Sequence, residues 1–387
     1  MDYRCLSSHR IMIRDSSRTE AFARALAATV KPGSVVLDVG AGTGILSCLA
    51  ARAGAARVYA IERTPAAEMT SLLAQSNNFA DVVRVVQGDI RAISLPEKVD
   101  IIVSEWMGSI GVDENMLGPV LWARDHFLKP DGVLIPTVVT ALASPVATAL
   151  RPDIGFFLNR PYGLDLTPLS EPFVHELLMI RRRIQVSDLA AEPQVLWRTD
   201  VMSDPPSVVR QPYSANLKFT MHKNARVSAL GVWFSAELSP GVSLSNAPSA
   251  PDTHWGQFQL PLETQLELCT GDVLEMKVTA RSVGPDPLQF SWSARVNDGP
   301  WQNHDMMGAM PAHPAPSPSP PTQEPPHSAL SLFLSTLAVD PDLLGEFLSD
   351  PDAIMARHEL PDVFRAALKS LDPTQIQGAM YESEPAT

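Results

Sequence analysis

Cysteine is scarce in this chain of 387 residues: Cys5, Cys48 and Cys269 lie far apart, and no C-x-x-C pair occurs. This argues against a disulfide framework and against a structural zinc site. No run approaches the roughly 18 apolar residues that a membrane-spanning helix needs, so we expect no membrane association. The N-terminal segment MDYRCLSSHR lacks the apolar core of a signal peptide, and we therefore expect a cytoplasmic protein.

Basic residues are also in short supply, because 30 Lys and Arg face 43 Asp and Glu and leave a formal net charge of −13. Such a charge disfavours direct nucleic-acid binding and suits a basic partner, although it also serves ordinary solubility. The excess of acidic over basic residues is concentrated at the C-terminal end, since residues 328–387 hold ten acidic residues and three basic ones.

Proline marks a boundary near the C-terminus. The segment PAHPAPSPSPPTQEPP, residues 311–326, has eight prolines in sixteen positions and predicts an extended linker. Proline and aspartate helix starts after it predict a small all-helical module. We expect a first domain over 1–137, a second over 138–308, a linker over 309–327 and the module over 328–387.

Strand and helix patterns alternate over residues 34–138. The runs SVVLDVG, RVYAIE, VVRVVQ, VDIIVSE and GVLIP read as strands, and helical spacing fills the intervals, including 114–128. This order predicts an α/β domain with a doubly wound parallel sheet. Ligands of such sheets bind at the carboxyl ends of the strands.

The pattern changes after residue 138, where alternating runs such as LKFTMH, SALGVWFSAEL and VLEMKVTAR predict an antiparallel β-barrel or sandwich. Residues 156–185 interrupt these strands with helix-like and irregular sequence.

A glycine-rich turn follows the first predicted strand in VLDVGAGTGILS. Gly40, Gly42 and Gly44 let the backbone approach a ligand closely, and the next helix offers free N–H groups. A nicotinamide-type fingerprint would need a glycine at position 45, which is Ile45 in this chain, so a nicotinamide cofactor is disfavoured. Glu62 ends the second strand, where a carboxylate accepts hydrogen bonds from both ribose hydroxyls.

The pattern D-x-G-x-G-x-G, which begins at Asp38, resembles class I S-adenosylmethionine methyltransferases. Asp89 follows the third strand, within reach of an adenine amine.

Two acids, Glu105 and Glu114, stand nine positions apart in SEWMGSIGVDENM, after a buried strand. Such a pair can serve as a general acid and base, a metal site, a site for an organic cation, or a solvated loop with an acid at a helix start. A metal would want a third ligand, and Asp113 is the only other charged residue in the stretch.

With SEWMG-x5-ENM and with THW at 253–255, the chain resembles the protein arginine methyltransferase family over residues 3–305. The resemblance implies a Rossmann-like domain, a β-barrel with an inserted helical arm at 156–185, and a head-to-tail homodimer formed through that arm. It implies S-adenosylmethionine as cofactor and arginine in a protein or peptide as acceptor.

The same resemblance assigns residues to roles. The segment MIRDSSR matches an N-terminal family motif, so that Arg18 contacts the cofactor carboxylate and Asp15 partners His254. The implied catalytic residues are Glu105, Glu114, His254 and Asp15. The implied cofactor residues are His9, Arg18, Asp38, Gly40, Gly42, Gly44, Glu62, Asp89 and Ile90, and the implied substrate residues are Tyr3, Met12, Met116 and Trp255.

A guanidinium explains why two carboxylates are needed. It is planar, charged and delocalised, so it is a poor nucleophile. Two carboxylates on different edges fix its plane and polarise positive charge away from the attacking nitrogen. Two alternatives remain open at this point: a small guanidine or amine metabolite as acceptor, and a non-catalytic scaffold. The C-terminal module is either a docking module for basic substrate or a solvated appendage.

Overall fold

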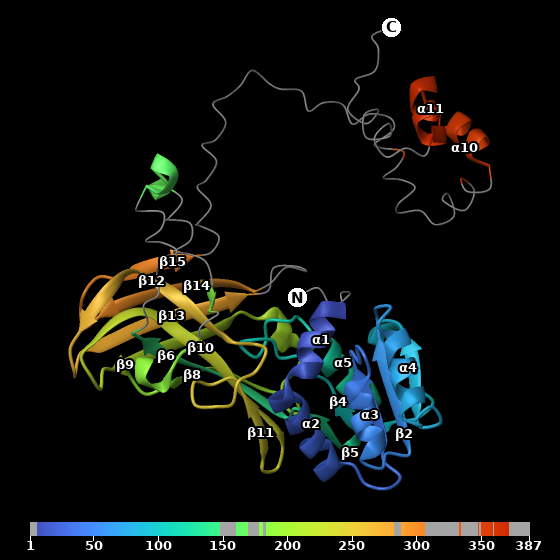
Figure 1. Ribbon diagram of the computed structural model, residues 1–387, viewed down its shortest axis with the longest axis horizontal. Helices are drawn as coiled ribbons and strands as arrows, with labels where there is room; N and C mark the ends of the chain where they lie inside the picture. Colours follow the sequence, from blue (N-terminus) through green and yellow to red (C-terminus); the bar gives the residue numbers. More distant parts are fainter. Residues whose placement is uncertain are drawn as a thin grey trace. The chain divides into compact units, whose positions relative to one another are not determined.

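The computed structural model describes residues 6–147, 160–168, 178–180, 183–281, 288–305, 333, 347, 350–358 and 360–370. The chain divides into two compact units, Met1–Pro311 and Ala312–Thr387 (Figure 1). Tyr3, the predicted linker at 309–327 and much of the predicted arm at 156–185 lie outside the described residues. None of the described helices is long and apolar enough to cross a membrane.

A parallel sheet of five strands forms the first half of the larger unit, in the order β3-β2-β1-β4-β5. Helices cover both faces, so the central strands are mostly apolar, and all five residues of β1, including Asp38, are buried. The predicted α/β fold is confirmed. The strands are β1 (Val35–Val39), β2 (Arg57–Glu62), β3 (Val83–Gln87), β4 (Val99–Val103) and β5 (Leu128–Ile135).

Helices alternate with these strands, and two more precede them. α5 begins three residues later than the sequence pattern predicts, since Glu114 and Asn115 belong to the loop before it. The helices are α1 (Leu6–Arg14), α2 (Ser16–Thr29), α3 (Ile45–Arg52), α4 (Ala67–Ser76) and α5 (Leu117–Phe127), with the 3-10 turn η1 (Ile90–Ala92) after β3.

Two antiparallel sheets form the second half of the larger unit. One has the order β7-β12-β10-β6-β8 with β11 beside β10, and the other has the order β15-β14-β13-β9. Buried residues alternate with less buried ones along β13, as a sheet with one core face requires. The strands are β6 (Val138–Val146), β7 (Leu178–Ile180), β8 (Gln194–Asp200), β9 (Tyr213–Thr220), β10 (Ala225–Ser239), β11 (Val242–Ser245), β12 (Gln257–Leu268), β13 (Val273–Arg281), β14 (Gln289–Val296) and β15 (Gln302–Asp305).

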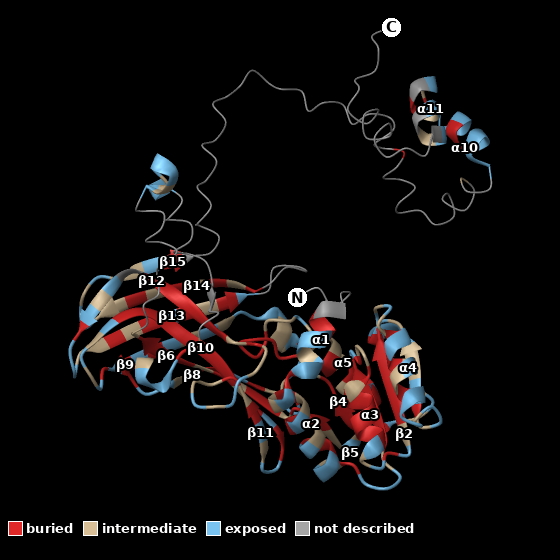
Figure 2. Cartoon of the chain, in the orientation of Figure 1, coloured by how far each residue is buried: buried red, intermediate tan, exposed pale blue. Residues whose placement is uncertain are grey.

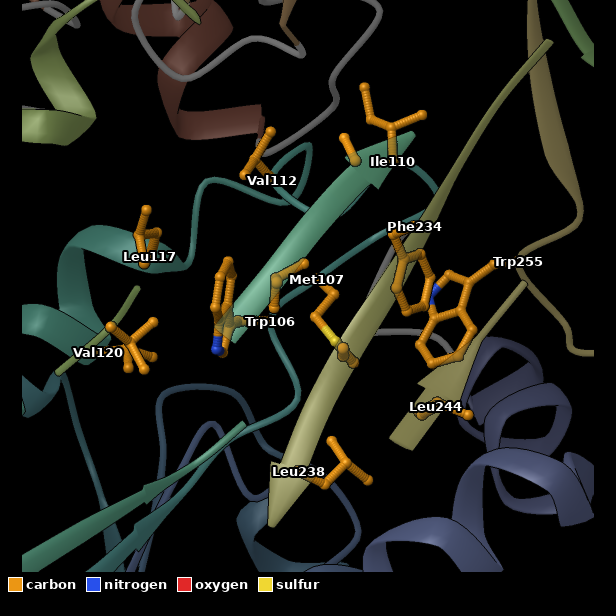
Figure 3. Packing of buried hydrophobic residues seen from close by; sticks show 14 of the residues in the cluster. Trp106, Met107, Ile110, Val112, Leu117, Val120, Phe234, Leu238, Leu244 and Trp255 are labelled. Atoms are coloured by element: carbon orange, nitrogen blue, oxygen red, sulfur yellow. The ribbon is translucent and has the colours of Figure 1, made fainter. Parts of the chain in front are cut away.

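One continuous hydrophobic core joins the parallel sheet to the antiparallel sheets, and the buried strands of both halves appear in red in Figure 2. Trp106, Met107 and Ile110, in the loop after β4, are 0% exposed. Met107 and Ile110 lie toward Phe234 of β10, and Trp106 lies toward Leu117 and Val120 of α5 (Figure 3). The loop that carries the two acids is therefore packed against both halves.

The smaller unit contains α10 (Pro351–Arg357) and α11 (Asp362–Ser370). Asp350 caps α10 by accepting a hydrogen bond from the Ala353 N–H. A separate small core contains Phe333, Ile354, Met355 and Leu360. Helical structure is thus present in the described part of the predicted module.

Candidate active site

A cavity opens at the carboxyl ends of β1, β2, β3 and β4, where a doubly wound sheet binds its ligands. Helix α1 and the loop between β4 and α5 contribute to its wall. The structure therefore brings together most of the residues that the sequence singled out. Those that line the cavity are His9, Met12, Arg18, Gly40, Gly42, Glu62, Asp89, Ile90, Glu105, Glu114 and Met116.

The turn between β1 and α3 requires its glycines. Gly40, Gly42 and Gly44 have φ values of 76°, 58° and 83°, in the left-handed region that other residues rarely adopt. Space is also restricted, since a Cβ on Gly42 would lie 3.1 Å from Cε1 of His9 and a Cβ on Gly44 would lie 2.5 Å from Cγ2 of Thr70. Larger residues would push α1 and α4 away from the turn.

Glu62 ends β2 with its side chain against the glycine turn. Its Oε2 accepts from the Gly42 N–H at 2.9 Å and its Oε1 from the Thr64 N–H at 2.6 Å. Each carboxylate oxygen has a second lone pair, so the side chain still has acceptor capacity for hydroxyls in the cavity. Asp89, after β3, caps η1 by accepting from the Arg91 N–H at 2.9 Å.

Asp38 does not line the cavity. Its carboxylate is buried beneath the turn and accepts a hydrogen bond from Ser47 Oγ at 2.6 Å. Burial raises the pKa of Asp38 to about 7, and the nearby Glu62 carboxylate acts in the same direction. The position of Asp38 favours support of the turn over contact with a ligand, and a direct cofactor contact remains a prediction.

Arg18 and Glu105 form a buried ion pair at the cavity wall. Arg18 Nε and Nη2 donate to Glu105 Oε2 at 3.2 and 3.0 Å, and both side chains are 6% exposed. Glu105 Oε1 accepts from the Met107 N–H at 3.3 Å. Arg18 Nη1 is buried and has no hydrogen-bond partner among the described residues. A buried guanidinium N–H without a partner is costly, so this atom suits the carboxylate of an amino-acid ligand.

The loop between the two acids is shaped by Asp113, which the sequence showed only as an extra charge. Its carboxylate oxygens accept from the Ser109 and Ile110 N–H groups at 3.1 and 2.9 Å. Burial nevertheless raises the pKa of Asp113. Gly108 has φ 62°, and a Cβ there would lie 2.4 Å from Asp113 Oδ1. The signal in the sequence is an aspartate shortly after a glycine turn, because aspartate side chains in turns often accept hydrogen bonds from nearby backbone N–H groups.

Asp15 connects the N-terminal helices to the segment before β12. One of its oxygens caps α2 through the Arg18 N–H at 2.9 Å, and the other accepts from both the N–H and the Nδ1 of His254 at 2.8 Å. Burial favours a raised pKa, but these hydrogen bonds outweigh it and lower the pKa of Asp15. The ionised carboxylate requires a proton on His254 Nδ1, which leaves Nε2 as the acceptor nitrogen of the neutral ring.

Trp255 belongs to the hydrophobic core. It is 3% exposed, and its ring packs edge-on against Phe234 at a centroid distance of 5.1 Å (Figure 3). Its carbonyl accepts from Ser109 Oγ at 3.1 Å. Trp255, His254 and Asp15 do not line the cavity. Met12 and Met116 do line it, and a Cβ on Gly40 would lie 3.0 Å from Cε of Met116.

The geometry thus combines a glycine turn, a carboxylate at the end of β2 and an arginine N–H without a partner among the described residues with two acids that line the same cavity. The comparisons with known proteins agree. A family model described as PRMT5 arginine-N-methyltransferase matches residues 13–135, and one described as arginine methyltransferase oligomerization subdomain matches residues 143–290. Protein arginine N-methyltransferase 1.1 of Arabidopsis thaliana is 32% identical over 298 residues, which cover 75% of this chain and 75% of that protein. The chain belongs to the protein arginine N-methyltransferase family.

Other members of the family show the same extent of similarity. Protein arginine N-methyltransferase 6 of Xenopus laevis is 32% identical over 288 residues, which cover 70% of this chain and 84% of that protein. The Trypanosoma brucei PRMT1 enzyme-prozyme heterotetrameric complex with AdoHcy matches with a TM-score of 0.72 and 26% identity, covering 79% of this chain and 99% of that one.

The predicted enzyme class and its cofactor are confirmed: this arginine N-methyltransferase uses S-adenosylmethionine as methyl donor. The predicted fold, a Rossmann-like domain followed by a β-barrel, is that of the family. Residues 143–290 form its oligomerisation subdomain. Among the described residues, no group of three or more His, Cys, Asp or Glu is arranged to hold a metal ion.

The Asp38→Asn variant tests the effect of the buried acid on the stability of the cofactor-free protein. The folded pKa of about 7 exceeds the ordinary 3.8, so the folded chain retains a proton that the unfolded chain loses. Stability therefore falls as pH rises from about 4 to 7, and an amide that still accepts from Ser47 abolishes this loss. We expect Asp38→Asn to gain on the order of 2–4 kcal/mol over wild type between pH 4 and pH 8 in urea unfolding.

Asp131→Asn, at an exposed position, is the matched control and should follow the wild-type pH dependence. An Asp38→Asn protein whose stability changes with pH as wild type does would contradict this account of Asp38.

Proposed function

We propose that this enzyme methylates a guanidinium nitrogen of arginine in a protein or peptide, and that Glu105 and Glu114 hold the guanidinium. The observation that carries the proposal is that the two carboxylate residues line one cavity together with the glycine turn and Glu62. A cofactor pocket and a site for an organic cation are therefore contiguous, as methyl transfer requires.

The residues fit the cofactor at both of its ends. We assign Arg18 to the carboxylate of its amino-acid part, because Nη1 is buried without a partner among the described residues. We assign Glu62 to the ribose hydroxyls, because it ends β2 and lines the cavity. When bound, S-adenosylmethionine supplies a methyl group on a positively charged sulfonium.

Glu105 contributes a partly occupied carboxylate. Its Oε2 already accepts two hydrogen bonds from Arg18 and its Oε1 accepts one long bond from Met107, so Oε1 has capacity for a guanidinium N–H. The ion pair with Arg18 keeps Glu105 from rotating, which fixes the plane of a guanidinium that binds to it. Glu114 then bonds another edge, and positive charge is drawn away from the nitrogen that attacks.

The nitrogen loses a proton during or after transfer, and we assign its removal to the Asp15–His254 pair. The 2.8 Å bond from His254 Nδ1 to Asp15 supports this assignment, because it leaves Nε2 as the acceptor. Neither residue lines the cavity, so this assignment requires a relay between the guanidinium and His254. No strong base is needed, because methyl transfer to a guanidinium adds a second positive charge, and the group then readily releases one proton to become the monocationic product.

We also propose that two copies of the chain associate through the 156–185 arm. The described part of this arm exposes Tyr162 and Leu164 at 87% and 59%. Helices α1 and α4 expose apolar side chains that such an arm could cover, with Ile11 and Leu72 at 45% and 55%. Exposed large apolar residues on both surfaces support burial of each against the other in a homodimer.

Charge and thiol chemistry support our proposals for the substrate and the compartment. A net charge of −13 favours basic, arginine-rich partners and supports neither direct nucleic-acid binding nor membrane association. Cys48 and Cys269 are free thiols, which suits a reducing compartment, and we propose that the protein is cytoplasmic.

The Glu105→Gln variant tests the assignment of the guanidinium site. The amide keeps the shape of the side chain but removes its charge, so the arginine-peptide rate should fall about 10²-fold or more. Binding of S-adenosylhomocysteine, measured by calorimetry, should persist because the amide oxygen still accepts from Arg18, and Glu62 and the glycine turn are unchanged. Glu97→Gln, which alters a surface pair with Arg57, should keep the wild-type rate. Full activity of Glu105→Gln would exclude this role.

The Leu164→Asp variant tests the arm. A charge cannot be buried against apolar helices without a large penalty, so the variant should sediment as a monomer in analytical ultracentrifugation where wild type sediments as a dimer. Met202→Asp replaces another exposed apolar side chain, outside the arm, and should remain dimeric. A Leu164→Asp dimer as tight as wild type would refute assembly through this arm.

A further inference from the structure

A buried asparagine lies where the methyltransferase domain meets the barrel. Asn246 follows β11 directly and is 3% exposed. Its side-chain oxygen accepts from the Phe234 N–H of β10 at 2.7 Å. This bond fixes the amide plane and aims the two N–H groups of Nδ2 away from β10.

Both of those N–H groups are used, and each reaches a different loop. Nδ2 donates to the carbonyl of Ser109 at 2.8 Å and to the carbonyl of Gly256 at 2.6 Å. Ser109 lies between Glu105 and Glu114, and Gly256 directly follows the Thr253–Trp255 segment. One side-chain amide therefore bonds the loop of the two acids to the loop that carries His254.

The hydrogen-bond chain continues toward the arm through Gln257. Its Nε2 donates to the backbone carbonyl of Asn246 at 2.7 Å, and its Oε1 accepts from the Ile184 N–H at 2.8 Å. Gln257 is 2% exposed and Ile184 is 1% exposed. Ile184 lies at the end of the 156–185 segment, so three buried hydrogen bonds connect the base of the arm to Ser109.

An amide is the side chain that this position demands. It accepts from one N–H and donates to two carbonyls at once. An aspartate has the same shape and accepts from Phe234, but it places a carboxylate against two carbonyl oxygens and removes both donors. Ser109 is also held by Asp113 through its N–H and by Trp255 through its hydroxyl, and the Asn246 amide adds the bond to its carbonyl.

We propose that Asn246 is a positioning residue for catalysis, that it holds the loop of Glu105 and Glu114 against the barrel, and that Gln257 links this position to the base of the arm. The inference rests on the proposed roles of Glu105 and Glu114. A displacement of about 1 Å in a group that orients a reactant lowers a rate on the order of 10²-fold. Loss of the two donors therefore acts on transfer and leaves the glycine turn and Glu62, which lie on other elements of the cavity wall, in place.

The test compares Asn246→Asp, Gln257→Glu and Ser144→Ala in the full chain with an arginine peptide. Asn246→Asp should lower kcat/KM about 10- to 100-fold and leave the affinity for S-adenosylhomocysteine at the wild-type value. Gln257→Glu should also lower kcat/KM, but by a smaller factor, because the bonds from Nδ2 of Asn246 to Ser109 and Gly256 remain. Ser144→Ala removes a buried barrel hydrogen bond to Ala191 and should keep wild-type kcat/KM.

A pH series separates positioning from loss of folding. The introduced carboxyl of Asn246→Asp takes up a proton as pH falls and regains one donor, so the ratio of variant to wild-type activity should rise toward acid pH. If that ratio is constant, or if Asn246→Asp keeps wild-type kcat/KM while the enzyme still depends on Glu105, the inference is overturned and the proposed function stands. If Glu105→Gln is fully active, the proposed function fails instead.

Discussion

The buried ion pair between Arg18 and Glu105 is the constraint on which the site depends. A carboxylate removed from water must be paired, and Arg18 supplies that pairing through two N–H groups. The same guanidinium keeps a third N–H, on Nη1, without a partner among the described residues. Arg18 therefore contacts the acid that we assign to the substrate and is also suited to hold the carboxylate of the cofactor. Both ligands are then placed relative to one rigid group.

The second feature that shapes the site is the segment 253–256, in which three successive residues form hydrogen bonds with other parts of the chain. His254 bonds to Asp15 at the start of α2, Trp255 accepts from Ser109, and Gly256 accepts from Asn246. The N-terminal helices and the loop of the two acids are both fastened to the barrel at this one place. Catalytic geometry thus depends on the junction between domains as well as on the parallel sheet.

Local patterns in the sequence predicted what depends on neighbouring residues. The glycine turn, Glu62 after β2 and the acid loop after β4 are each set by a strand end and a few positions of chain. Contacts between residues far apart in the sequence could not be predicted from such patterns. Arg18 and Glu105 are 87 residues apart, so no local spacing pairs them, and Asn246 has the sequence context of an ordinary loop residue. The burial of Trp255 likewise depends on Phe234 from another strand. The family resemblance supplied the Asp15–His254 pairing, which no spacing rule would have found.

The central claim is that two carboxylates hold the guanidinium of a peptide arginine for methyl transfer. Mass spectrometry of the products tests it most directly, after incubation of the full chain with S-adenosylmethionine, an arginine-containing basic peptide and a pool of small guanidines and amines. The account predicts that fragmentation places the added methyl on a guanidinium nitrogen of the peptide arginine. Methyl groups found only on small molecules, or on peptide positions other than arginine, would contradict it.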